Sequence, residues 1–347
     1  MTWSLRPDLD VFEIPYGLGL QIKGRQHPII LRGKHVSPAW AYLKTQLATG
    51  ETLKQMIEQC SDPDLQMHVR QLIEVLKTQD VLFSPSVASD PSSPADLVQQ
   101  RQQLFWNRLG FPDRLEEVAP TCFLASGLFG AICGELLFQS GVSPNYIALW
   151  DDDGAGEAYL KPWCSSEQLV KFATTDPSGL TTQLSEWRDE LGLIVCCTRQ
   201  GSQEIFAALN TFCLEEQKRW IYANEEAGTF RIGPTILPRQ TACYTCMTLR
   251  QSSRDPLALE TILYEQARGQ IRSSGQTSLR GELLAGATMA ASLVVVEVLR
   301  ILQGQIPQLL NTQIHLEPWE LRQRMHRLLP VPRCPSCYAG HLVLRHV

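Results

Sequence analysis

The chain has 347 residues and carries 31 lysines and arginines against 36 aspartates and glutamates, a net charge of −5 at pH 7. This length predicts a small and a larger domain, with a sizeable core in at least one of them. The basic residues are scattered, which excludes the positive patch of a dedicated nucleic-acid binder. Charged residues near the N-terminus exclude an ordinary signal peptide, and the apolar, uncharged run at residues 283–296 is too short to span a membrane. We therefore expect a cytoplasmic protein without nucleic-acid or membrane partners.

The N-terminal region predicts short strands followed by helices. The stretches VFEIPYGLGLQIK and HPIILRG indicate strands joined by a glycine-containing turn. Helical spacing follows over residues 38–47, 51–59 and 64–78, and DVLF can return as a strand. Strands with three helices in so short a region are typical of a winged helix-turn-helix (α+β) domain. The predicted division is a winged-helix domain at residues 1–83, a Ser-, Pro- and Asp-rich linker at 84–97 and a larger domain at 98–347.

Winged helices often bind DNA, but the charges of the third predicted helix argue against that role here. It offers only His68, Arg70 and Lys77 to a DNA groove, and the acidic Asp64 and Glu74 lie on the same segment. A DNA-binding helix needs several cations to neutralise phosphates. A peptide is therefore the ligand that we expect.

The predicted peptide site combines an edge strand with an apolar helix. An extended peptide can add to such a strand, so that backbone hydrogen bonds give affinity and the apolar groove gives selectivity. The predicted peptide-binding residues come from the strand at 29–32 and the third helix, and they are Ile29, Ile30, Leu31, Arg32, Val69, Leu72, Ile73 and Leu76.

The stretch LASGLFGAICGELLFQSGV has the pattern of a nucleotide-binding strand, loop and helix. Gly127 and Gly130 stand where backbone approaches phosphates at a helix N-terminus, and Asp151 and Asp153 follow the next strand, where a carboxylate would bind ribose. Ala125 replaces the first glycine of the usual motif. The alternative is that both glycines only permit close packing of helix and strand.

Two thiol pairs, CYTC and CPSC, predict a metal site. Four cysteines bind zinc tetrahedrally and leave no position open, so the zinc would be structural. The predicted ligands are Cys243, Cys246, Cys334 and Cys337. Accidental pairs or a redox pair are the alternatives. The cysteines in apolar contexts are expected to be small core residues, and they are Cys122, Cys133, Cys196, Cys197 and Cys213.

These features follow one another in a familiar order. A glycine-containing strand-loop-helix, an acid-terminated strand, a strand ending in CT, a strand with GP and then C-x-x-C resemble the ubiquitin-activating-enzyme family, from about residue 118 to the C-terminus. The resemblance implies a ThiF-like, Rossmann-type α/β domain with a structural zinc. In active members an arginine from an N-x-x-R-Q run, a lysine and a metal-binding aspartate in a C-T-D-N turn hold ATP and magnesium.

This chain departs from the active members at several of those positions. The segment after Asp153 has no N-x-x-R-Q run, and Arg199 stands in the place of the metal-binding aspartate. A guanidinium cannot coordinate a cation. We therefore predict a degenerate domain with no catalytic residues and no bound ATP, in which Gly127, Gly130, Asp151 and Asp153 form a vestigial nucleotide loop.

A winged-helix domain before a zinc-bearing, degenerate ThiF-like domain resembles the leader-binding partner proteins of azoline-forming YcaO cyclodehydratases. That resemblance implies a role in the biosynthesis of ribosomally made, modified peptides such as bacteriocins. The first domain would bind the leader of a precursor peptide by strand addition. The second would present the peptide to a separate YcaO protein, which uses ATP to cyclise Cys, Ser or Thr onto the preceding amide.

The sequence is also compatible with two other functions and with an oligomeric assembly. One alternative is an active adenylating enzyme of the ThiF-like family that acts on a peptide or carrier-protein C-terminus. Another is a ligand-sensing transcription factor. The apolar helix expected near residues 286–304 is buried either in the core or between subunits, so a homodimer or a stable complex with the YcaO partner is a further expectation.

Overall fold

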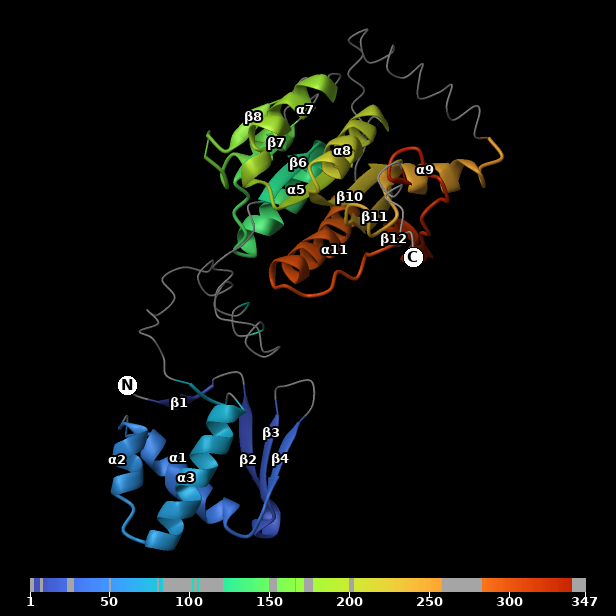
Figure 1. Ribbon diagram of the computed structural model, residues 1–347. Coiled ribbons are helices and arrows are strands. Elements are labelled where there is room, and N and C mark those ends of the chain that lie inside the picture. Colours follow the sequence, from blue (N-terminus) through green and yellow to red (C-terminus); the bar gives the residue numbers. More distant parts are fainter. Residues whose placement is uncertain are drawn as a thin grey trace, which may run out of the picture. The chain divides into compact units, whose positions relative to one another are not determined.

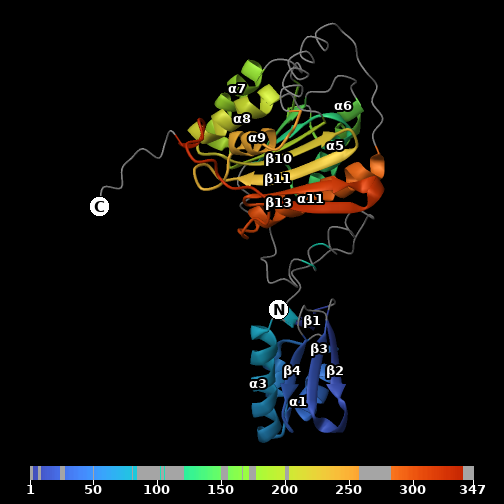
Figure 2. The ribbon, with the colours of Figure 1, turned by 90° about the vertical axis from the view of Figure 1, so that its right-hand side faces the viewer.

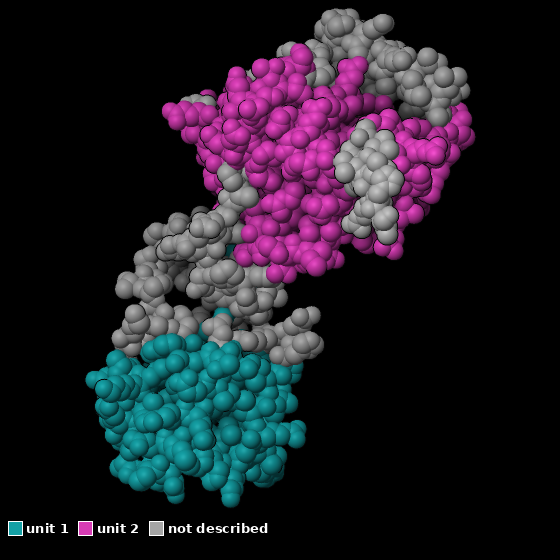
Figure 3. All heavy atoms as spheres, viewed as in Figure 1, with its two compact units in different colours: residues 1–114 teal, residues 115–347 magenta. Residues whose placement is uncertain are grey.

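The computed structural model describes residues 3–6, 9–23, 28–49, 51–79, 81–83, 102, 105, 121–149, 155–165, 167–171, 177–199, 203–257 and 283–338. The chain divides into two compact units, residues 1–114 (unit 1) and 115–347 (unit 2), which Figures 1 and 3 show. The predicted linker at residues 84–97 lies outside the described residues, so the predicted domain boundaries stay predictions.

Unit 1 combines antiparallel strands with helices. Its strands are β1 (Ser4–Leu5), β2 (Asp10–Ile14), β3 (Gly19–Lys23), β4 (Ile29–Arg32) and β5 (Leu82–Phe83). Its helical segments are η1 (Pro15–Gly17), α1 (Val36–Leu47), α2 (Leu53–Glu58) and α3 (Pro63–Thr78). The strands form a sheet in the order β2-β3-β4 and a separate antiparallel pair, β1-β5, so the DVLF segment does return as a strand.

Local sequence signals explain where the helices of unit 1 begin. Thr52 and Gln55 form a reciprocal capping box at the start of α2. Asp62 accepts hydrogen bonds from the first backbone amides of α3, and Pro63 occupies the first helical position. The core lies between these helices and the inner face of the β2-β3-β4 sheet, where Leu20 and Ile22 are fully buried. The predicted succession of strands and helices is thus confirmed.

Unit 2 is a mixed sheet of eight strands in the order β13-β12-β11-β10-β9-β6-β7-β8. The strands are β6 (Thr121–Ala125), β7 (Tyr146–Leu149), β8 (Leu169–Lys171), β9 (Leu193–Arg199), β10 (Arg219–Glu226), β11 (Thr229–Ile236), β12 (Thr312–Glu317) and β13 (Arg322–Arg327). From β8 to β10 all neighbours are parallel, and β11, β12 and β13 continue the sheet antiparallel. The predicted α/β fold is confirmed.

Helices cover both faces of this sheet (Figure 2). They are α5 (Gly127–Gln139), α6 (Ala155–Leu160), α7 (Pro177–Glu186), α8 (Gln203–Glu215), α9 (Tyr244–Ser252) and α11 (Leu284–Leu302), with short turns η2 (Arg188–Glu190) and η3 (Pro318–Glu320). Helices α5, α6 and α11 lie on one face and α7, α8 and α9 on the other. The chain leaves β6 toward β7 and β8 and then returns to β9 on the opposite side, which makes the carboxyl ends of β6 and β9 the switch point of the sheet.

Helix α11 is the apolar helix that the sequence predicts near residues 286–304. Among the described residues it alone has the length and composition of a membrane-spanning helix, but 56% of that stretch is buried inside the protein. It packs against α5 and β11, as the core helix of a globular domain does. Core burial therefore accounts for most of its apolar character.

A buried carboxylate fixes this helix to the sheet. Glu297 is only 2% exposed. Its carboxylate accepts hydrogen bonds from the Thr235 hydroxyl at 2.7 Å, the Leu309 amide at 2.8 Å and the Gln308 amide at 2.9 Å. A buried charge is tolerated only when such donors satisfy it. The carboxylate thus joins α11 to β11 and to the chain that enters β12.

We predict that Glu297→Ala lowers the free energy of unfolding by about 3 kcal/mol or more, because three donors, those of Thr235 and Leu309 being buried, lose their acceptor. Urea denaturation followed by circular dichroism measures this loss. Glu215→Ala, at an exposed site on α8, is the control and should change the value by less than about 0.5 kcal/mol. Equal effects of the two changes would contradict the structural role of Glu297.

Candidate functional site

The loop between β6 and α5 lies at the switch point of the sheet, where Rossmann-type folds bind nucleotides. The Ser126 amide donates a hydrogen bond to the Cys197 carbonyl at 3.0 Å, so the loop is joined to β9. Gly127, with φ of +66°, starts α5 in the left-handed region that favours glycine. At Gly130 a Cβ atom would lie 2.8 Å from the Cys197 carbonyl oxygen and 3.1 Å from the Ala125 Cα. Both glycines are therefore required by the backbone itself.

The neighbouring strand ends carry polar side chains that bind one another. The Thr198 hydroxyl donates to Oδ1 of Asn224 at 2.9 Å, and both residues are buried. Arg199 is the last residue of β9 and lies at this same edge of the sheet. Asp151 and Asp153, predicted to belong to the nucleotide loop, lie outside the described residues. The end of β9 thus carries a cation and not a carboxylate.

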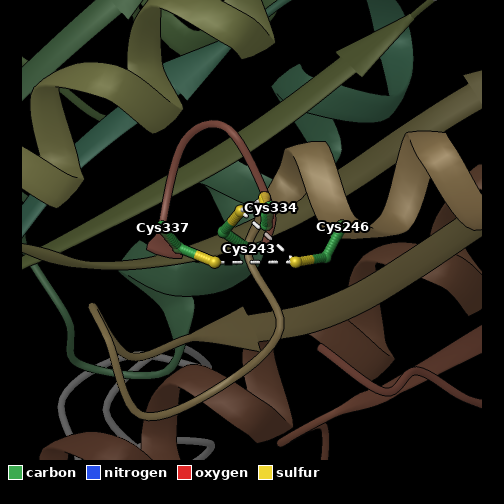
Figure 4. A group of neighbouring side chains, drawn as sticks. All are labelled: Cys243, Cys246, Cys334 and Cys337. Atoms are coloured by element: carbon green, nitrogen blue, oxygen red, sulfur yellow. Dashed lines mark hydrogen bonds between the residues drawn. The ribbon is translucent and has the colours of Figure 1, made fainter. Parts of the chain in front are cut away.

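The two predicted thiol pairs meet in one cluster, which Figure 4 shows. Sγ of Cys243 lies 3.8 Å from that of Cys246 and 3.7 Å from that of Cys334, and the sulfurs of Cys246 and Cys337 are 3.6 Å apart. All four sulfurs lie within 4.8 Å of one another, and three of the residues are buried. This arrangement can hold a metal ion.

Two asparagines position the cluster by accepting hydrogen bonds from backbone amides. The Asn311 side chain accepts from the Ala242 amide at 2.7 Å, and its carbonyl accepts from the Leu328 amide at 2.8 Å, so one residue joins both cysteine-bearing segments. The buried Asn210 accepts from the Tyr244 amide at 3.0 Å at the start of α9. These contacts preorganise the thiols independently of any ligand.

The thiols also influence one another. The hydrogen bond from the Cys243 thiol lowers the pKa of Cys246 to about 4 and raises that of Cys243. The Val331 amide donates to the Cys246 sulfur at 3.3 Å and further favours its thiolate. A thiolate is the form of cysteine that binds metals. Hydrogen bonds in the cluster thus prepare one ligand for a cation.

The remaining predicted core cysteines are buried as expected. The exposed fraction is 1% or less in each of them, and they are Cys122, Cys133, Cys196, Cys197 and Cys213. Burial raises the pKa of Cys122, Cys196 and Cys213, so these thiols stay protonated and unreactive.

Strand β4, the predicted peptide-binding strand, is an edge of its sheet in the described residues. Ile29 and Leu31 pack partly against the core of unit 1. Ile30 is 45% exposed, and Arg32 is exposed beside it on the outer face. The strand therefore offers open backbone groups and alternating side chains, which are the elements of strand addition.

The helical half of the predicted groove differs from the expectation. The α3 side chains expected to line it are Val69, Leu72, Ile73 and Leu76, and the structure buries all four in the core of unit 1. Their helical spacing marks the face of α3 that packs against the rest of the unit, and spacing alone cannot distinguish such a face from a binding face. Their role in peptide binding stays a prediction.

The sequence names His68 only as a possible DNA contact, and it gives no signal for His35 or Val75. The rings of His35, which follows β4, and His68 of α3 stack at 4.0 Å with an angle of 14°. This stack joins the end of β4 to the middle of the helix. Val75, two turns after His68, is 40% exposed. Neither histidine belongs to an apolar pattern, so no periodicity marks them.

Comparisons with known proteins agree with this fold. No protein-family model and no curated protein sequence matches the chain. The crystal structure of E. coli MccB with AMPCPP and SeMet MccA has 16% identity and a TM-score of 0.60, covering 97% of this chain and 99% of that one. MccB, the microcin C7 biosynthetic enzyme, in complex with N-formylated MccA has 15% identity and a TM-score of 0.61, covering 97% and 100%.

A second type of similar structure is a heterocyclase in complex with substrate and cofactor. It has 18% identity and a TM-score of 0.61, and the match covers 97% of this chain but only 39% of that chain. At these identities the likeness is one of fold. The chain therefore shares the MccB-like fold, and it matches only part of the heterocyclase.

We predict that Cys334→Ser lowers the free energy of unfolding by at least about 3 kcal/mol, because a four-thiolate site loses a ligand and its binding energy is folding energy. Thermal melting with and without a chelator measures this. The chelator should lower the melting temperature of the native chain but have little further effect on Cys334→Ser. Cys164→Ser, outside the cluster, is the matched control. A native chain that is indifferent to chelation and free of metal by elemental analysis would refute the site.

Proposed function

We propose that this protein binds the leader of a ribosomally made precursor peptide and presents it to a separate YcaO-type cyclodehydratase in the cytoplasm. Unit 1, as a winged-helix recognition domain, takes up the leader, and unit 2 is a ThiF-like scaffold without catalysis of its own. The observation that carries this proposal is the open edge of β4 beside the exposed part of α3.

Strand addition to β4 fits the side chains found there. A leader lying along the strand exchanges backbone hydrogen bonds with it, and its alternate side chains face Ile30 and Arg32 on one side of the sheet and the α3 side on the other. His68 and Val75 supply a mixed polar and apolar wall. Arg32 and the exposed Lys34 favour an acidic leader, chiefly through the association rate.

Solved structures with this fold support a peptide-related role. MccB was solved with MccA, and the heterocyclase with its substrate. The heterocyclase chain extends well beyond the part that this chain matches.

Zinc is the metal that we propose for the cysteine cluster. Four sulfurs arranged tetrahedrally at about 2.3 Å from a zinc ion are about 3.8 Å apart. Three of the sulfur separations, at 3.6 to 3.8 Å, agree with that geometry, and all four sulfurs lie within 4.8 Å of one another. With four thiolates the ion has no open position, so its role is structural.

The competing candidate is an adenylating enzyme, which the MccB structures with ATP and AMPCPP favour. We propose instead that this chain consumes no ATP, because Arg199 stands at the strand end where the family places its metal-binding aspartate. ATP–pyrophosphate exchange by the purified chain, with a precursor peptide present, distinguishes the two functions. Exchange that is lost in an Arg199→Ala variant would replace our proposal with the enzymatic one.

Assembly of unit 2 into a homodimer or with the YcaO partner stays part of the proposal. One side of α11 leaves Leu284, Met289 and Val296 exposed despite the burial of the rest of the helix. Such apolar side chains on a helix are typical of association surfaces. Light scattering of the chain alone and mixed with the partner measures both forms of assembly.

We predict that Ile30→Asp weakens leader binding at least tenfold, because a carboxylate on the edge strand repels an acidic strand and removes apolar contact. Fluorescence anisotropy with the labelled leader of the neighbouring precursor gene measures the affinity of the full chain. Leu18→Asp changes another exposed apolar residue of unit 1, at 59% against 45% for Ile30, outside β4 and should leave the affinity within about twofold. Equal losses in both variants, or no saturable binding by the native chain, would contradict the assigned groove.

A further inference from the structure

Strand β13 forms an open edge of the unit 2 sheet. It pairs with β12 over six residues, from Thr312 with Arg327 to Glu317 with Arg322, and no described strand lies beyond it. Its outer backbone N–H and C=O groups therefore face away from the sheet. Open edges of this length are templates for pairing with another chain, and proteins normally cover or blunt them.

The side chains of this edge are cationic although the whole chain is acidic. Arg322 is neutralised by ion pairs with Glu317 at 3.1 Å and Glu320 at 2.7 Å. Arg324 and Arg327 are exposed and form no ion pair with another described residue. Two uncompensated positive charges thus lie along the strand.

Large apolar side chains flank the same edge. Trp319 is 87% and Leu321 83% exposed in the turn that joins β12 to β13. Met325, within β13, is 62% exposed, and Leu329 just after it is 60% exposed. An edge protected by charge alone would need no apolar surface of this size. The combination of open backbone, cations and apolar side chains is instead that of a recognition surface.

The charges decide which kind of strand can pair there. A second copy of this chain would bring the same arginines to within about 5 to 8 Å of the first set, and like charges at that range destabilise a strand pair. Side chains alternate between the two faces of a sheet, so Arg324 lies on one face of β13 and Met325 and Arg327 on the other. A strand with carboxylates three positions apart would neutralise Arg324 and Arg327, one on each face, and an apolar side chain between them would lie beside Met325.

We propose that β13 takes up an extended acidic segment of a partner protein as a ninth strand of the unit 2 sheet. Backbone hydrogen bonds align the segment, the two arginines select its charge, and Trp319 and Leu321 contact apolar residues at its end. This surface is separate from β4 in unit 1, so it adds a partner site to the proposed leader site.

The test uses the full chain and a short synthetic peptide in which two glutamates three positions apart are set among valine and threonine, labelled for fluorescence anisotropy. We expect saturable binding that weakens at high salt and at least tenfold in the double variant Arg324→Glu, Arg327→Glu. A control with the same change in net charge, Lys44→Glu with Lys54→Glu on unit 1, should retain the native affinity. A peptide with lysine in place of glutamate should not bind.

Strand pairing is tested by two further peptides, N-methylated at alternate residues in opposite phase. A strand uses the N–H groups of only one edge to pair, so one methylated peptide should lose binding and the other should keep it. Equal binding by both, an unaffected double variant, or no binding by the native chain overturns the proposal. Ile30→Asp should leave this binding intact while it weakens leader binding, so the two sites can fail independently.

Discussion

The convergence of four thiols from two distant segments is the constraint on which the antiparallel half of unit 2 depends. Cys243 and Cys334 are 91 positions apart, and the segments that bear them follow β11 and β13. Bringing such segments together costs chain entropy, which the metal proposed for this cluster would offset. Asn311 already holds both segments by hydrogen bonds, so the cluster and the strand ends are formed by the same contacts.

The loop between β6 and α5 and the thiol cluster occupy opposite ends of the sheet. The loop follows the carboxyl end of β6, whereas β11 and β13 end beside the starts of β10 and β12. Gly130 must be glycine because the Cys197 carbonyl leaves no room for a Cβ. The glycines can therefore persist for packing alone after the polar residues of a nucleotide site have changed. A glycine motif is evidence for the turn that it makes and only indirectly for a ligand.

The sequence predicts best those residues that can act only together with others in one site. Two C-x-x-C pairs predict one cluster because each supplies only half of a tetrahedral site, and the structure brings them together. The apolar spacing of α3 predicts the helix and its buried face correctly. It does not tell which surface meets a ligand, since Val69 and Leu72 are core residues. The position of a strand within a sheet is set by distant pairing, so neither the open side of β13 nor the histidine stack beside β4 has a local signal.

The pairing of β1 with β5 has a consequence for how recognition can change over time. Ser4 lies opposite Phe83, and the Arg6 amide donates to the Val81 carbonyl at 3.0 Å, so the first and last strands of unit 1 are neighbours. A unit whose entry and exit meet at one place can be exchanged between chains, because its replacement disturbs few contacts elsewhere. Unit 1 can thus be exchanged as a whole, and the peptide specificity that we propose for it would be exchanged with it.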